Sequence, residues 1–231
     1  MKNLLYVSII MAMASCAKPS EKQMTLSGEI EGLKKGTVLL QKVMDTSLVS
    51  VDSVQVNGIS TFSFSEEIES PEVFYIYLRK DGSLSEDRIS FFAEPGDITI
   101  KTSLKSFGLD VVINGSANQE KFIEYQKVMK RYTDKNLSLI EESFNAQKEG
   151  EDSVANVLKT QQNRLLASKY LATVNFALSH TDLEIAPYLM LTEVYDANIK
   201  YLDTVHNSLT PKIKESKYGK ALEAFIKNRK E

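Results

Sequence analysis

The residues best able to do chemistry in this chain are its two histidines, His180 and His206. Asp182 follows His180 by two positions, and a histidine oriented by a carboxylate can act as the general base for a serine or cysteine nucleophile. Such a nucleophile must converge on the pair in space, and nothing in the sequence marks one. Both histidines fall at expected helix ends, where an imidazole commonly faces solvent and the helix dipole. We therefore expect no catalytic role for either histidine.

A second group of ionisable residues is acidic. It consists of Glu141, Glu142, Glu149, Glu151 and Asp152. No cluster of His, Cys, Asp and Glu in the chain has metal-ligand spacing, and neither a phosphate-binding glycine loop nor an EF-hand pattern occurs. We interpret the acidic group as the solvated surface of a helix–turn–helix, with a cation site as the alternative. No metal and no cofactor are expected.

Aromatic residues provide the one candidate ligand face. In the segment VFYIYL, Tyr75 and Tyr77 share one face of an expected strand, while Phe74 and Ile76 share the other. Exposed tyrosines in a row could stack on a sugar or grip a peptide. The favoured alternative places them in the core of a sandwich with their hydroxyl groups at its rim. Tyr75 and Tyr77 are thus a possible ligand face, although tryptophan, the usual platform for sugars, is absent.

Cys16 is the only cysteine in the 231 residues. Lys2 precedes an apolar run over residues 4–13, and small residues lead directly into the cysteine, which is the order of a secretory signal peptide. The run is too short to span a bilayer. Its MASC ending resembles the lipobox of bacterial lipoproteins, whose cysteine is lipidated on sulfur and becomes the first residue after cleavage. The alternative is a buried N-terminal helix with an incidental cysteine.

The lipobox resemblance implies a localisation and a lipid anchor. A signal peptide would occupy residues 1–15 and a polar tether residues 16–23. Lipoproteins of this kind carry three acyl chains, and two or more chains anchor a protein stably in a membrane. Ala17 beside the cysteine favours the outer membrane, facing the periplasm, by analogy with enteric sorting. Because Cys16 would carry lipid, we expect neither a disulfide nor a CxxC site.

The composition is that of a soluble globular body. The formal charge is −3, which gives no electrostatic footprint for nucleic acid. Hydrophobic residues make up 42% of the chain, which is ordinary for a globular protein, and no other segment approaches the length of a membrane helix. We expect contact with the membrane only through the lipid.

Residues 24–115 alternate between apolar and polar types and carry frequent turn signals, which predicts an antiparallel β-sandwich. In the turn between two of the strands, Asn57 and Gly58 predict a type I′ hairpin, and a change of parity predicts a bulge near Asp52–Ser53. The expected strands cover residues 24–31, 37–44, 48–56, 60–66, 72–80, 87–94, 97–102 and 109–114.

Residues 116–231 predict helices. Ser116 with Gln119, and Thr181 with Glu184, are possible capping boxes. The first helix carries a stripe of Phe122, Tyr125, Met129, Tyr132, Asn136 and Leu139, which is expected to pack on the sheet or on the next helix. A turn at KEGED leads to a helix over 152–179, whose second half is apolar enough to be buried on all sides. A helix that carries YLMLTEVY, opened or kinked by Pro187, comes next, and short helices near 196–207 and 211–229 follow. The fold class predicted is α+β.

Several segments together resemble a known family. MTLSGEIEGLKKGTVLLQK, VDSVQVNGISTFSF, FFAEPGDITI and VINGSANQEKF resemble the uncharacterised β domain that precedes the thioredoxin module in TlpA-like (AhpC/TSA-type) thiol-disulfide oxidoreductases, lipoproteins of Gram-negative gut anaerobes. The helical part, ending TPKIKESKYGKALEAFIKN, resembles the linker region before the thioredoxin fold. In those relatives the CxxC-bearing domain begins where this sequence stops at Glu231. The resemblance therefore implies a form without the redox module, and its catalytic residues carry over to no position here.

These features together predict a non-enzymatic, lipid-anchored envelope protein that binds an unknown protein or a small envelope ligand. The alternative is an accessory or regulator that acts in trans on a thiol-disulfide oxidoreductase. A hydrolase on this scaffold is unsupported by any constellation of residues. A pocket that contains the tyrosines and carboxylates would favour a ligand, whereas a broad apolar patch would favour a protein partner.

Overall fold

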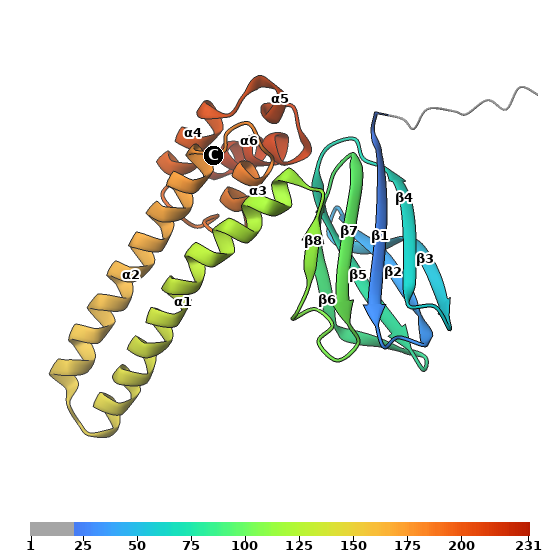
Figure 1. Cartoon of the computed structure of the whole chain (residues 1–231). Coiled ribbons are helices and arrows are strands. Elements are labelled where there is room, and N and C mark those ends of the chain that lie inside the picture. Colours follow the sequence, from blue (N-terminus) through green and yellow to red (C-terminus); the bar gives the residue numbers. More distant parts are fainter. Residues whose placement is uncertain (1–20) are drawn as a thin grey trace, which may run out of the picture.

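The computed structural model describes residues 21–231 and contains an N-terminal pair of β-sheets followed by a helical region (Figure 1). The signal peptide, Cys16 and most of the expected tether lie outside the described residues. The strands are β1 (Gln23–Glu31), β2 (Lys35–Met44), β3 (Ser47–Asn57), β4 (Thr61–Glu67), β5 (Glu72–Lys80), β6 (Ser83–Ala93), β7 (Gly96–Ser103) and β8 (Val112–Asn114). The prediction of an α+β fold is confirmed.

The strands form two four-stranded sheets, in the orders β4-β1-β7-β8 and β3-β2-β5-β6. All pairs are antiparallel except β1 with β7, which run parallel. Alternate residues of each strand point into one shared apolar core, as the two-residue period requires. In β5, for example, Phe74, Ile76 and Leu78 belong to this core. The alternation in the sequence therefore reports a true two-layer sandwich.

The predicted Asn57–Gly58 hairpin is wrong. β3 and β4 belong to different sheets, so the turn between them carries the chain from one sheet to the other. Asn57 ends β3, Gly58 alone takes a positive φ of 94°, and its N–H donates to the Lys34 carbonyl oxygen at 2.8 Å. The prediction of a bulge near Asp52–Ser53 is confirmed. The register between β2 and β3 shifts so that Val51 has no partner, one position before Asp52–Ser53.

The helices are α1 (Ala117–Lys148), α2 (Asp152–Leu178), α3 (Ile185–Thr192), α4 (Ile199–Ser208), α5 (Pro211–Lys214) and α6 (Lys217–Lys230). α1 and α2 form a long antiparallel hairpin that projects away from the sandwich, while α3 to α6 gather around its base (Figure 1). The base has a core of its own, which includes Val174, Met190, Leu202 and Leu222. Towards the KEGED turn the hairpin core is thin. Its buried residues there are Leu139, Ala146 and Leu158.

The helical base packs on the outer face of the sheet that contains β5 and β6. Val73 and Phe92 of this face join a cluster with Tyr125, Ile185 and Leu189 from the helices. The Phe92 ring meets Tyr188 edge-on at a centroid distance of 5.1 Å. The expectation that the stripe of the first helix packs on the sheet or on the next helix is thus confirmed for Tyr125 and Met129, which belong to this cluster.

Polar side chains fasten the same junction. The backbone N–H of Phe92 donates to Gln119 Oε1 at 3.0 Å, and that of Val73 donates to the Tyr218 hydroxyl at 2.9 Å. Ser116 caps α1 by accepting from the Gln119 N–H at 3.0 Å, as predicted. The Gln119 side chain, however, turns to the sheet instead of closing the capping box. The start of α1 is therefore held by β6.

The second predicted capping box, Thr181 with Glu184, does not form. Asn118 of α1 caps α3 instead, because its Oδ1 accepts from the Ile185 N–H at 2.9 Å. Asn118 Nδ2 then donates to Glu94 at 2.7 Å and to Glu184 at 3.2 Å. One buried amide thus connects the end of β6, the start of α1 and the start of α3.

Two expectations for the helical stripes have different outcomes. In α1, Tyr125, Met129 and Leu139 are buried as predicted. In α2, the second half is not buried on all sides, because Leu166 and Leu171 are 48% and 46% exposed. α2 contacts α1 along one side and α3 and α4 near its end, so its remaining surface stays open.

Candidate functional site

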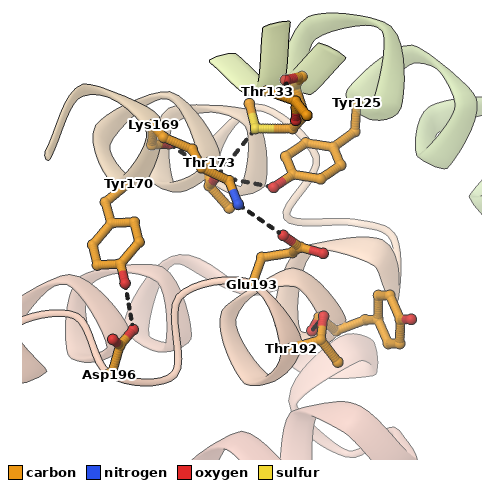
Figure 2. Close-up of polar contacts among 10 residues, drawn as sticks. Tyr125, Thr133, Lys169, Tyr170, Thr173, Thr192, Glu193 and Asp196 are labelled. Atoms are coloured by element: carbon orange, nitrogen blue, oxygen red, sulfur yellow. Dashed lines mark hydrogen bonds and ion pairs between the residues drawn. The ribbon is translucent and has the colours of Figure 1, made fainter. Parts of the chain in front are cut away.

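Polar side chains of α1, α2 and α3 meet where the hairpin joins the helical base (Figure 2). Lys169 lies on α2, and Glu193 directly follows α3. The Lys169 Nζ and Glu193 Oε2 atoms are 3.3 Å apart, and each side chain is about one-third exposed. Beside this ion pair, the Tyr125 hydroxyl and Thr173 Oγ1 are 3.0 Å apart. The Tyr170 hydroxyl donates to Asp196 at 2.6 Å. These contacts fix the angle at which the hairpin leaves the base.

The phenols at this junction are held in their protonated form. Burial raises the pKa of Tyr125 well above its usual value, and burial likewise raises the pKa of Tyr188 to about 12. The hydrogen bond to Asp196 is the main cause that raises the pKa of Tyr170 to about 12. At neutral pH these groups are therefore hydrogen-bonding hydroxyls, not bases or nucleophiles.

One flank of the hairpin carries three adjoining hollows. The first, of about 390 Å³, lies between the middle of α1 and α2. The second, of about 360 Å³, lies at the base and shares Thr133 and Lys169 with the first. The third, of about 710 Å³, lies towards the KEGED turn and shares Gln162 with the first. We call this continuous surface the flank groove. From Gln126 to Gln147 it follows α1 for about 30 Å.

The flank groove is rich in side-chain amides. Three lie on α1 and three on α2, so both walls present them. They are Gln126, Asn136, Gln147, Asn156, Gln162 and Asn163. An amide offers two donors and a carbonyl acceptor, and can therefore bond to groups of either kind.

The charged residues of the flank groove balance in sign. The basic ones are Lys130, Lys159 and Lys169, and the acidic ones are Asp134, Asp152 and Glu193. Lys130 pairs with Asp134 at 3.3 Å, and Lys169 with Glu193 at the same distance. A surface balanced in this way has no electrostatic preference for a polyanion or a polycation.

Large apolar side chains stand beside the amides. Leu166 lines the first hollow and is 48% exposed. Ile140 of α1, 47% exposed, lies one turn beyond Asn136 and one turn before Ser143, and these two neighbours line the first and third hollows. Phe144 follows Ile140 by four positions and is 66% exposed. The flank groove therefore combines hydrogen-bonding amides with open apolar surface.

The predicted ligand face, Tyr75 and Tyr77, lies elsewhere, on the outer face of the sheet. Tyr75 is half-buried and packs against the helix–sheet cluster, not in the sandwich core. Tyr77 is only 7% exposed, and its hydroxyl accepts a hydrogen bond from Arg88 at 3.1 Å. The Arg88 guanidinium also lies 5.0 Å from the centre of the Tyr75 ring. The two tyrosines are thus brought together by one arginine, and their role as a ligand face stays a prediction.

The other sequence candidates have structural positions or lie outside the described residues. His180 Nδ1 lies 2.8 Å from the Phe176 carbonyl oxygen near the end of α2, and the ring lies against Phe176. All five acidic residues near the KEGED turn are exposed. Within residues 21–231, no group of His, Cys, Asp and Glu is arranged to hold a metal ion. In that same part of the chain, no helix is both long and apolar enough to cross a membrane. Cys16 lies outside the described residues.

The amides of the flank groove, apart from Asn136, were not singled out from the sequence. A partial signal was present: Asn156 and Asn163 recur seven residues apart in α2, which places both on one side of that helix. Which side faces α1 depends on how the helices pack, and the pattern of α2 alone does not reveal this.

The N-terminal part of the chain is similar to a known domain family. Residues 24–122 match the model of a domain of unknown function, DUF4369. The match spans nearly all of both sheets and the first turns of α1, including the residues that cap α1 and fasten it to β6. No curated protein matches the chain. The sandwich and the start of α1 are thus a DUF4369 domain.

Proposed function

We propose that the protein is a non-enzymatic, lipid-anchored binding module of the bacterial cell envelope. The lipid would be attached at Cys16 and hold the protein at the outer membrane, on its periplasmic side. The α1–α2 hairpin is the binding element. The DUF4369 domain and the helical base position it.

The observation that carries this proposal is the flank groove. Its hollows adjoin along one side of the α1–α2 hairpin. This hairpin projects from the rest of the molecule (Figure 1). Leu166 lines one of these hollows and is 48% exposed, and Ile140 and Phe144, on successive turns of α1, are 47% and 66% exposed. Apolar side chains beside hydrogen-bonding groups in a groove are typical of ligand sites.

The arrangement of ionisable groups supports a binding role over a catalytic one. His180 is occupied by the end of α2, and the phenols of the junction stay protonated at neutral pH. Lys169, which lines the groove, is already paired with Glu193. Each group therefore has a structural partner, and none is poised as a nucleophile with its base.

Photo-crosslinking from inside the groove tests the proposal. A photoreactive amino acid at position 166, in the full chain expressed in its native envelope, should give a discrete adduct of higher mass. The matched control is position 157. Val157 is 57% exposed and lies nine residues away on α2, half a turn around the helix axis from Leu166. Adducts at neither position, or equally at both, would show that the hairpin flank is not the binding element.

The identity of the adduct also bears on the alternative function. The TlpA-like resemblance suggests an accessory role toward a thiol-disulfide oxidoreductase in trans. A thioredoxin-fold protein captured at position 166 but not at position 157 would support that role.

A further inference from the structure

The flank groove has a lining whose chemistry points to one class of occupant. This assignment rests on the function proposed above, because it names the ligand of the same surface. We propose that the flank groove binds an extended, uncharged oligosaccharide.

The hydrogen-bonding inventory of the groove carries the first step. Amides line it on both walls, with Gln126 and Gln147 near its two ends and Asn136 and Gln162 between them. A sugar hydroxyl is both donor and acceptor, and so is a side-chain amide. A row of amides can therefore satisfy a row of hydroxyl groups in either orientation. Thr133 lies where the first two hollows meet; its hydroxyl donates to the Met129 carbonyl oxygen at 3.3 Å and so offers a ligand an acceptor only.

The apolar residues carry the second step. A pyranose ring has polar edges and apolar C–H faces, so it needs apolar surface beside its hydrogen-bonding partners. Leu166 provides that surface inside the first hollow, and Ile140 and Phe144 are exposed on successive turns of α1 beside it. Ligand sites generally combine apolar lining with a few polar groups that set orientation.

The balance of charge carries the third step. The groove contains as many lysines as carboxylates, and two of the lysines are paired within it. A charged polymer would have to break those pairs without gaining a net field. The length of about 30 Å along α1 accommodates several sugar units in a row. An uncharged chain of sugars fits both the charge and the length.

A polypeptide fits less well. The main-chain groups of α1 and α2 are satisfied within the helices, so the groove offers an extended peptide no strand edge to pair with. A docked amphipathic helix would bury Asn156, Gln162 and Asn163 under apolar side chains, at a cost for each unpaired amide.

Calorimetric titration of the full chain with defined oligosaccharides tests the assignment, in a detergent that has no sugar head group. The probes are maltohexaose, cellohexaose and hexa-N-acetylchitohexaose, each compared with its disaccharide. We expect saturable binding of at least one hexaose, and about tenfold weaker binding of the corresponding disaccharide because it fills less of the groove. Hexagalacturonate and a neutral glycine–serine peptide serve as charged and peptide comparators.

Adjacent glutamines provide the matched variants. Gln162→Ala removes an amide shared by two hollows, and should weaken hexaose binding about fivefold, as expected for one lost hydrogen bond. Gln161→Ala removes the same side chain from an exposed position one step away on α2 and should leave binding unchanged. Thermal melting of both variants verifies that they remain folded.

The outcomes separate this assignment from the broader proposal. No binding of any hexaose, equal loss in both glutamine variants, or binding of the charged or peptide comparator at least as tight as any hexaose would overturn the oligosaccharide assignment. A discrete adduct at position 166 in the same case would leave the binding-module proposal standing with a different ligand. Absence of both sugar binding and a position-specific adduct would overturn both.

Discussion

Glu184 carries a carboxyl group into the junction between the sheet and the helices. It is 4% exposed and accepts a hydrogen bond from Asn118, which also bonds to Glu94. Burial is the main cause that raises the pKa of Glu184 above its usual value, and the nearby charge of Glu94 raises it further. The hydrogen bond from Asn118 and the charge of Lys212 oppose this rise without cancelling it. At the scale of single residues, the stability of the junction thus depends on whether Glu184 is protonated.

The Glu184→Gln substitution should flatten the pH dependence of stability. In the folded chain Glu184 holds its proton more tightly than in the unfolded chain, so above the ordinary carboxyl pKa the folded state binds more protons. The free energy of unfolding therefore falls as the pH rises from about 4.5 toward neutrality. Urea titrations at several pH values should show this fall in the parent and a smaller one in the variant. Asp182→Asn, at an exposed neighbouring position, is the control and should keep the parental slope.

Gly115 joins β8 to the cap of α1 and should not tolerate a side chain. Its φ is +97°, and an added Cβ would overlap the Asp97 carbonyl oxygen. Gly115→Ala should lower the free energy of unfolding by about 3 kcal/mol or more, from strain and overlap together. Gly58 has a similar φ of +94° with open space around it, so Gly58→Ala should cost only about 1 kcal/mol. Equal losses in chemical denaturation would mean that the overlap at Gly115 is relieved by a small backbone shift.

Single residues also show which contacts could be predicted from the sequence. Ser116 was predictable as a cap because a cap acts within its own turn. Gln119 was predicted to bond back to Ser116, yet its side chain accepts from the Phe92 N–H. The Glu184 carboxylate accepts a hydrogen bond from Asn118. These partners lie far away in the sequence. Local patterns identify the residues that need a partner, and tertiary packing decides which partner they obtain.

At the scale of elements, strand and helix positions followed from periodicity, whereas their pairing did not. The alternation in β3 and β4 is genuine, but their turn residues suggested one hairpin where the chain changes sheets. The flank groove likewise depends on how two elements pair. α1 and α2 were both predictable as helices, and the choice of facing sides that creates the groove was not.

The thin core of the hairpin makes a matched comparison possible in α1. Leu139 is 1% exposed and packs in the cluster with Ala146 and Leu158, while Leu137, two positions away, is 59% exposed. Leu139→Ala should lower the free energy of unfolding by about 2–3 kcal/mol, from lost burial and the cavity left behind. Leu137→Ala should change it by less than about 0.5 kcal/mol. Denaturant midpoints measure both, and a similar loss for Leu137 would show that its apolar surface is covered in solution.

At the scale of the whole molecule, the sheets and helices should behave as one unit under proteolysis. Gln119 and Tyr218 tie the helices to β6 and β5 by hydrogen bonds, and an aromatic cluster fills the space between. Limited proteolysis should cut first at the KEGED turn or before Met24, and mass spectrometry of the fragments shows where. Early release of a folded 24–115 fragment would instead mean that the sandwich stands alone.

Cys16 should be the only strong attachment to the membrane. The Cys16→Ser variant loses the acyl site, so it should incorporate no labelled palmitate and should remain an unprocessed precursor or enter the soluble fraction. A chain that starts at Lys18 should be soluble without detergent. Fractionation with metabolic palmitate labelling of the parent checks both. A Cys16→Ser protein that is still cleaved and still bound to membranes would contradict the lipobox interpretation.

The direction of the hairpin gives this anchor a geometric consequence. In Figure 1 the start of β1 lies far from the turn that joins α1 to α2. Seven steps of chain separate Cys16 from Gln23, a leash of at most about 25 Å. α1, with 32 residues, extends for roughly 48 Å. A lipid at Cys16 would keep the sandwich close to the bilayer, while the hairpin turn would reach several tens of ångströms farther out. The anchored protein would therefore contact ligands at a distance from its own membrane.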